Sequence, residues 1–329
     1  MRRTLVLMVA IAVGILAVPL GAEAQEAGKV YRIGTIWPGR PDPGSEMVWR
    51  AVRERLQELG YIDGRNVIFE QRWAEGRLER LQELVQDLIA ANVDVIVAWS
   101  TPAVAAAKRV TTTTPIVMAS SGDAVATGLV ESLSRPGGNV TGVSWHHAEL
   151  ATKWLQLMIE LLPRAKRILV LWDSTNPPDV VARPSLETAA AQVKTRLDFV
   201  EARDAADYEL ALRAGADRHA DGVIVLPSAR AFIHRGHLAE AALKNRLPTV
   251  HGFRGFVDAG GLLAYTPRQS ELARQAAGYV DRILKGAKPA DLPVEQPNTF
   301  ELVINMKTAK ALGLTIPQSL LIRADHVIE

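Results

Sequence analysis

The chain has 329 residues, of which 48% are apolar and 22% charged, and its formal net charge is +2. This near-neutral balance lacks the basic footprint of a nucleic-acid-binding protein, so no nucleic-acid partner is expected. The chain contains no cysteine, which excludes disulfides, thiolate catalysis and a lipid-modified N-terminal cysteine. The length suits two domains, each with its own hydrophobic core.

The N-terminus has the three parts of a secretory signal peptide. Arg2 and Arg3 precede an apolar run over residues 5–18, and residues 22–24 (Ala-Glu-Ala) supply small side chains for a cleavage site. The apolar run is shorter than the roughly 20 residues that a membrane-spanning helix needs. We therefore predict cleavage after Ala24, so that residues 1–24 are a signal peptide and the mature chain is soluble in the periplasm.

Short runs rich in valine and isoleucine alternate with longer amphipathic runs along the rest of the chain. This alternation predicts an α/β fold, with parallel strands joined by crossover helices. In the first half we predict strands at residues 30–37, 67–73, 93–99, 116–120 and 139–145, and helices at residues 45–59 (with Ser45 as N-cap), 78–91, 102–110 and 149–161. In the second half we predict strands at residues 167–172, 197–202, 222–227, 249–252, 262–265 and 300–304, and helices at residues 185–196, 207–220, 233–245, 268–285 and 306–312.

A short internal repeat supports two similar halves. The order strand, serine, helix, proline, strand occurs over residues 94–118 and again over residues 221–251. Two such sheets predict two lobes that face each other. Because ligands of open parallel sheets bind beyond the carboxyl ends of the strands, we expect both lobes to line one cleft that closes by a hinge.

Polar side chains follow several predicted strands at that edge. Ser100 and Thr101 begin a helix whose first turn offers N–H groups to a ligand carboxylate, although plain helix capping explains them equally well. Asp123 is a candidate acceptor for a ligand ammonium group, or else a turn residue. Arg40 is a candidate partner for a ligand carboxylate, and Tyr265 a candidate ligand or hinge contact. The same positional argument adds Ser120, Ser121, Asp173, Asn176, Ser228 and His251.

Four of the seven tryptophans lie at or near predicted carboxyl ends of strands, namely Trp37, Trp99, Trp145 and Trp172. An indole ring has a flat apolar face and one N–H donor, which suits stacking on a planar or apolar ligand. The alternative is that each ring fills the core of its own lobe. We expect at least one of the four to line the cleft, and we take Trp37 and Trp145 as ligand contacts.

Signatures of enzymes are missing from the sequence. It has no Gly-x-Ser-x-Gly elbow, no Gly-x-x-x-x-Gly-Lys loop and no His-Glu-x-x-His motif. His234 and His237 are three residues apart on a predicted helix, but without a nearby third ligand a solvated helix face is the better interpretation. We therefore predict no catalytic residue, no cofactor and no metal site.

Several long motifs resemble those of one family. They are YIDGRNV at residues 61–67, WAEGR at residues 73–77, SRPGGNVTG at residues 134–142, ILKGAKPADLPVEQP at residues 283–297 and FELVINMKTAKALG at residues 300–313. In this order they resemble ABC-transporter substrate-binding proteins related to the tryptophan/tyrosine-binding type, over nearly all of residues 30–329. The resemblance implies a type I periplasmic-binding fold, in which two Rossmann-like lobes are joined by three crossovers.

With that fold, lobe 1 comprises residues 25–143 and about 264–298, and lobe 2 comprises residues 144–263 and about 299–329. The resemblance also implies a permease with cytoplasmic ATPase subunits as partner. The chain departs from the family at two places. Asp123-Ala124 stands where Asp-Pro is frequent, and residues 227–230 (Pro-Ser-Ala-Arg) stand where aromatic-amino-acid binders carry Pro-x-Asp-Asn.

The predicted function is therefore that of a monomeric receptor that delivers a small solute to an ABC importer. A small organic acid or an amino acid, aromatic ones included, is the expected solute. Two alternatives stay open at this stage. One is a periplasmic enzyme on the same architecture, and the other is a ligand-loaded adaptor that signals to a membrane sensor.

Overall fold

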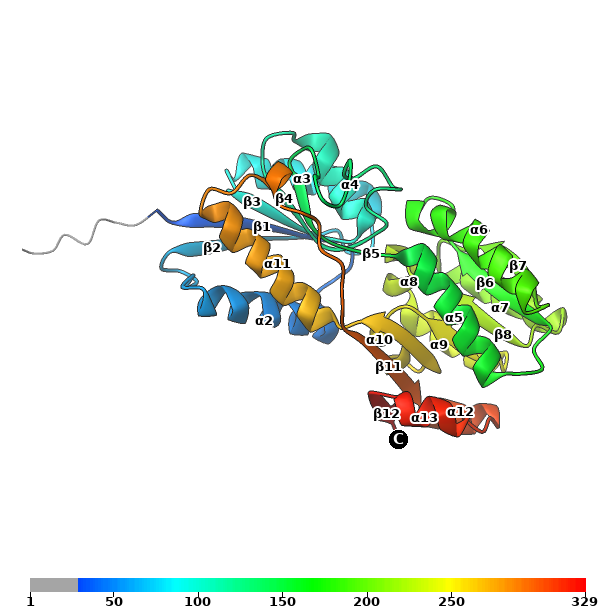
Figure 1. Ribbon diagram of the computed structural model, residues 1–329. Helices are drawn as coiled ribbons and strands as arrows, with labels where there is room; N and C mark the ends of the chain where they lie inside the picture. Colours follow the sequence, from blue (N-terminus) through cyan, green and yellow to red (C-terminus); the bar gives the residue numbers. More distant parts are fainter. Residues whose placement is uncertain (1–28) are drawn as a thin grey trace, which may run out of the picture. The chain divides into compact units, whose positions relative to one another are not determined.

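The computed structural model describes residues 29–329 and contains two β-sheets, each flanked by helices (Figure 1). Residues 31–329 form one compact unit. The predicted signal peptide and its cleavage site after Ala24 lie outside the described residues. Within residues 29–329, no helix has the length and apolar character needed to cross a membrane.

The first sheet has the strand order β2-β1-β3-β4-β5, and all its strands are parallel. Its strands are β1 (Tyr31–Trp37), β2 (Val67–Trp73), β3 (Val95–Trp99), β4 (Ile116–Gly122) and β5 (Val140–Trp145). Its helical segments are α2 (Pro43–Glu58), η1 (Leu78–Arg80), α3 (Leu81–Ala90), α4 (Thr101–Val110), α11 (Gln269–Leu284) and η2 (Pro289–Asp291). Although α11 comes late in the sequence, it packs beside α2 on this sheet (Figure 1).

The second sheet has the order β12-β11-β10-β9-β8-β6-β7. Its strands are β6 (Arg167–Trp172), β7 (Arg196–Glu201), β8 (Gly222–Val225), β9 (Thr249–His251), β10 (Leu263–Pro267), β11 (Phe300–Asn305) and β12 (His326–Ile328). Only the β10–β11 pair is antiparallel. The helices here are α5 (His147–Leu161), α6 (Pro177–Gln192), α7 (Ala205–Asp217), α8 (Ala229–Ile233), α9 (Arg235–Lys244), α10 (Arg254–Asp258), α12 (Met306–Leu312) and α13 (Gln318–Arg323).

Helices cover both faces of each sheet, which explains the continuous apolar runs of the central strands. In β3, Val95 and Val97 pack with α2 and α11, whereas Ile96 points to the other face and packs with α3 and α4. In β6, Ile168 packs with α5 and α6, and its neighbour Leu169 packs with α7 and α9. Because successive side chains of a strand point to opposite faces, all five residues of β3 and the four inner residues of β6 are buried.

The predicted α/β fold with two parallel-rich lobes is confirmed. We call the first sheet and its helices the first lobe, and the second sheet and its helices the second lobe. The chain passes between the two sheets after β5, after β10 and again before β11. The residue boundaries given above for the lobes stay a prediction; β5 ends at Trp145 in the first sheet, and β10 belongs to the second.

Some local predictions were wrong. The N-cap of α2 is Asp42, whose carboxylate accepts from the backbone N–H of Ser45, so Ser45 is the third helical residue of a capping box. Helix α6 begins at Pro177 rather than at residue 185, because Pro184 is accommodated inside the helix instead of ending it. The predicted helix at residues 233–245 corresponds to α9, and the short α8, α10, α13 and β12 were not predicted.

Gly142 allows β5 to lie close against β4 at the point where their register shifts. Its φ is +125°, and a Cβ atom there would lie 2.3 Å from the backbone oxygen of Met118. Gly142→Ala should lower the free energy of unfolding by about 2–5 kcal/mol, because it adds both backbone strain and a clash with main-chain atoms. Thermal unfolding measures this as a fall in Tm of several degrees.

The matched control is Gly138→Ala, where nothing lies within 4 Å of an added Cβ and φ is outside the left-handed region. Equal Tm values for the two variants would contradict this account of β5.

Candidate functional site

One pocket of about 510 Å³ lies at the carboxyl ends of strands from both lobes. The first lobe contributes Trp37 from the end of β1, Trp99 from β3, Ser120 from β4 and Trp145 from β5. The second lobe contributes residues that follow its strands, among them Asn176, Ser228 and Phe253. The volume is within the range of small-molecule sites, and apolar surface predominates in the lining.

Aromatic rings form the walls on both sides. Trp37 stacks on Trp99, with ring centroids 4.7 Å apart and an angle of 22° between planes. Across the pocket Phe253 lies 5.8 Å from Trp145 and 5.6 Å from Phe232. Each tryptophan that lines the pocket is also more than nine-tenths buried. The same indole rings therefore belong to the hydrophobic core and to the pocket wall.

Trp172 was considered with these tryptophans, but it does not line the pocket. Its ring packs edge-on against Phe199, and the Arg183 guanidinium lies 5.0 Å from it. Sequence reasoning missed Phe232 and Phe253. Phe232 lies one helical turn after Ser228, and Phe253 lies two residues after His251. This closeness to two predicted site residues was the feature of the sequence that could have identified them.

Ser100 and Thr101 hold the start of α4 at the pocket wall. Ser100 is the N-cap, with φ +92°, and its hydroxyl accepts from the N–H of Ala103 at 3.5 Å. The Thr101 hydroxyl accepts from the N–H of Gly122 at 3.1 Å and bonds to the Ser121 hydroxyl, also at 3.1 Å. Both residues line the pocket, and Ser121 lies behind them outside the lining. The positive end of the α4 dipole is therefore at the pocket.

On the opposite wall, Asn176 and Ser228 are fixed by their own lobe. The Asn176 amide donates to Asp179 at 2.7 Å, and the Ser228 hydroxyl caps α8 by accepting from the N–H of Ala231 at 3.1 Å. Asp179 is fully buried, and its Oδ1 lies 3.2 Å from Nε2 of His147, another lining residue. Burial raises the pKa of Asp179, and the contact with His147 opposes that shift.

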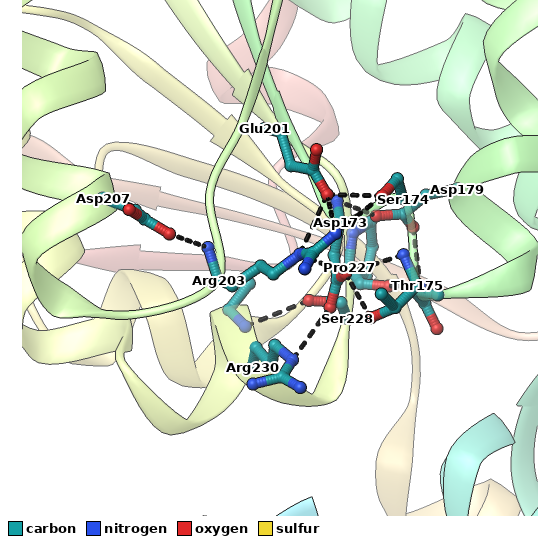
Figure 2. A network of polar contacts seen from close by, with 12 residues as sticks. Asp173, Ser174, Thr175, Asp179, Glu201, Arg203, Asp207, Pro227, Ser228 and Arg230 are labelled. Carbon is teal, nitrogen blue, oxygen red and sulfur yellow. Dashed lines mark hydrogen bonds and ion pairs between the residues drawn. The ribbon is translucent and has the colours of Figure 1, made fainter.

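The structure places Asp123 and Asp173 outside the pocket lining, so it lends no support to the predicted ligand contacts of these two residues. The Asp123 carboxylate turns toward α5 and accepts from the N–H of Ala148 at 3.1 Å. Asp173 belongs to a network of polar contacts within the second lobe (Figure 2), where it accepts from the N–H of Thr175 and lies 3.2 Å from Nε of Arg230. Protein groups already satisfy both carboxylates.

Three further candidates also lie outside the lining. Arg40 is exposed in the loop after β1. His251 is fully buried, stacked on Phe256 with centroids 4.6 Å apart, and its Nδ1 accepts from the N–H of Phe253. Tyr265 stacks on Phe300, with an angle of 11° between the rings. Arg40 follows β1 as predicted, but His251 is the last residue of β9, and Tyr265 lies inside β10, which continues to Pro267.

An ion pair that was not predicted joins the two lobes, and one of its residues, Arg235, lines the pocket. The second carboxylate oxygen of Asp42, the N-cap of α2, accepts from the guanidinium of Arg235 at the start of α9. Arg235 also donates to the carbonyl of Phe232 and lies 4.4 Å from that ring. Burial alone would raise the pKa of Asp42, but the Ser45 N–H and Arg235 together hold that pKa below its ordinary value.

Among residues 29–329, no group of three or more His, Asp or Glu side chains is arranged to hold a metal ion. The polar groups of the pocket are mainly hydroxyls, an amide and paired charges. Such groups can orient a small molecule by hydrogen bonds while the rings cover its apolar part.

Two α/β lobes that share a pocket at their strand ends define the fold of the periplasmic binding proteins. The family model described as "ABC transporter substrate binding protein" matches residues 42–328, and the chain belongs to that family. A tyrosine-binding protein of Clostridioides difficile (strain R20291) is 27% identical over 273 residues, which are 83% of this chain and 78% of that protein.

Two solved structures are similar over most of the chain. A protein from Streptococcus pneumonia in complex with L-Trp has a TM-score of 0.84 and 27% identity, and the match covers 91% of this chain and 100% of that one. A conserved domain protein from Vibrio cholerae gives the same TM-score, identity and coverage. Family membership confirms the resemblance that the motifs indicated.

The buried His251 predicts a pH-dependent stability. Burial, with nearby His147 as a second cause, lowers the pKa of His251 to about 3. Between pH 6.5 and 3 the unfolded chain takes up a proton that the folded chain cannot, so the free energy of unfolding falls as the pH falls. The slope from this residue is up to roughly 1.4 kcal/mol per pH unit.

In His251→Asn the Phe253 N–H keeps an acceptor, but the titrating group is gone. Urea unfolding from pH 7 to pH 4 should therefore show a smaller loss of stability in this variant than in the parent. His219→Asn, at an exposed turn, is the control and should follow the parent. If the free energy of unfolding fell equally with pH in all three proteins, His251 would not be the cause of the pH dependence.

Proposed function

We propose that this protein is a periplasmic receptor that binds a small organic acid or amino acid with an aromatic or apolar body. It releases the solute unchanged to the permease of an ABC importer. The observation that carries the proposal is the pocket of about 510 Å³ in which stacked Trp37 and Trp99 face polar groups of the other lobe. The signal-like N-terminus supports export, and the family supports a permease with ATPase subunits as partner.

The walls of the pocket favour a ligand with a flat apolar part. Rings from both lobes line it, and a planar ligand gains both apolar burial and stacking from such surfaces. The relatives named above bind tyrosine and L-Trp, which have this character. The hydroxyls of Ser100, Thr101 and Ser120 and the start of α4 offer the polar end of such a ligand its hydrogen bonds.

Binding by both lobes implies a hinge motion. A ligand that contacts both walls stabilises the arrangement in which the lobes approach, because it interacts with that state more strongly than with a separated one. The Asp42–Arg235 pair joins the lobes, and Arg235 lines the pocket. We infer that this pair forms on closure, slows ligand release and helps to present a closed monomeric receptor to the permease.

Calorimetric titration of the purified protein with amino acids, aromatic acids and sugars tests the proposed function. We expect stoichiometric binding of an aromatic solute, which mass spectrometry then recovers unchanged. Conversion of the solute to a product would establish an enzyme instead, and binding of sugars alone would reject the proposed ligand class.

The interlobe pair gives a second test with the solute found in that titration. Arg235→Gln or Asp42→Asn should raise the dissociation rate by about 5- to 30-fold, as expected for losing one or two kcal/mol of a partly buried pair. Asparagine remains a good N-cap, so Asp42→Asn leaves α2 capped. Stopped-flow tryptophan fluorescence measures the rate.

The control is Arg274→Gln, which removes an ion pair with Glu58 inside the first lobe. Release at the parent rate from both cross-lobe variants would show that the Asp42–Arg235 pair has no part in holding the solute.

A further inference from the structure

An α-amino acid brings an ammonium group into its binding site. Removing that charge from water is costly unless the site supplies a carboxylate or a full set of acceptors. The acidic side chains near the pocket therefore decide whether an amino acid or its counterpart without the amino group fits better.

Both acidic residues among the described lining residues already have cationic partners. Asp258 Oδ2 lies 3.5 Å from Nε of Arg254, and Glu301 Oε2 lies 3.2 Å from Nη1 of the same arginine. His326 is a further partner of Glu301, with Nε2 3.5 Å from Oε2. A ligand ammonium would have to compete with Arg254 for either carboxylate.

The acids at the strand ends of the second lobe are held in the network of Figure 2. Arg203 is bonded to Glu201 and lies 3.9 Å from Asp173, and Arg230 lies 3.2 Å from Asp173. Asp179 accepts from the backbone N–H of Asp173 at 2.9 Å. None of these three carboxylates lines the pocket.

In the first lobe, Asp42 already pairs with Arg235, and the acid at the end of β4 is Asp123. Its carboxylate accepts from the N–H of Ala148 and lies 3.8 Å from Nδ1 of His146. It is also outside the lining. Thus each of these carboxylates already has a protein partner, and an ammonium group would have to displace that partner or use neutral acceptors.

The start of α4 favours an anion at the pocket. The three arginines of the lining do not decide this, because each has an acidic partner: Arg254 pairs with Asp258 and Glu301, Arg235 with Asp42, and Arg268 with Asp325. The N-terminal end of α4, with its partial positive charge, opens at the pocket wall beside the hydroxyls of Ser100 and Ser120. A carboxylate is therefore favoured over an ammonium group at this wall.

We infer that the pocket selects an aromatic or apolar monocarboxylic acid without an α-ammonium group over the amino acid of the same shape. This inference rests on the proposed function and narrows its ligand class. The stacked indoles hold the ring, neutral donors take the carboxylate, and the Arg203–Arg230 network keeps the nearby acids unavailable.

Matched pairs of ligands test the inference by calorimetry. The pairs are 3-(indol-3-yl)propanoate with L-tryptophan, 3-phenylpropanoate with L-phenylalanine, and 3-(4-hydroxyphenyl)propanoate with L-tyrosine. The propanoate should bind at least about tenfold more tightly in the preferred pair, the effect of one poorly satisfied charged group. Tryptamine, which has the ammonium group but no carboxylate, should not bind.

Equal or tighter binding of the amino acid would overturn this inference and leave the proposed function intact. Binding of neither member of any pair, with another class of solute bound instead, would overturn the inference together with the proposed ligand class. Tight tryptamine binding would also overturn it.

A pair of variants tests the electrostatic cause separately. Ser228 lines the pocket and caps α8, and both aspartate and asparagine are good caps, so either replacement retains the helix start. Ser228→Asp adds a carboxylate to the pocket lining and should reduce or reverse the preference for the propanoate. Ser228→Asn, of nearly the same size, should keep the parental preference. An unchanged preference in a folded Ser228→Asp would overturn the inference.

Discussion

The carboxyl ends of parallel strands from two sheets converge on one pocket, and the other features of the site depend on this convergence. A parallel strand ends where the following helix begins, so its last residues and the helix cap lie together at one edge of the sheet. Trp99 and Ser100 are adjacent in sequence for this reason, and both line the pocket. The second lobe repeats the arrangement with Ser228 at the start of α8. The antiparallel pair β10–β11 returns the chain to the second lobe without disturbing that edge.

The same edge concentrates charge, and the protein neutralises most of it internally. Asp173 is bound by its own lobe through Arg230, and Asp123 by the start of α5. The pocket is consequently apolar on its walls and neutral in most of its polar contacts. Because these carboxylates already have protein partners, the ligand is better sought among apolar acids than among zwitterions. The Asp42–Arg235 pair differs from the others because it joins the two lobes instead of stabilising one of them.

The sequence alone was sufficient to predict strands and site positions where a local residue pattern determines them. The limits of β2 and β6 were predicted to the residue, since β-branched and aromatic runs with turn residues on either side specify strands. The positions of Trp37 and Ser100 at the pocket followed from their place at strand ends. The start of α6 was missed because Pro184 normally interrupts a helix, yet here it lies within one.

Contacts between distant residues could not be predicted in the same way. Asp173 is withdrawn from the pocket by Arg230, which is 57 positions later in the sequence. Arg235 reaches Asp42 only because α9 of one lobe lies near α2 of the other. A strand end therefore indicates which residues approach the site, whereas their partners decide which of them are free to bind a ligand.

A crystal structure of the protein grown with its tightest-binding aromatic solute would test the central claim most directly. The account predicts electron density for one ligand enclosed by both lobes, with its ring against Trp37 or Trp99 and second-lobe contacts at Asn176 or Ser228. A ligand that touches only one lobe, or that lies outside this pocket, would contradict the claim.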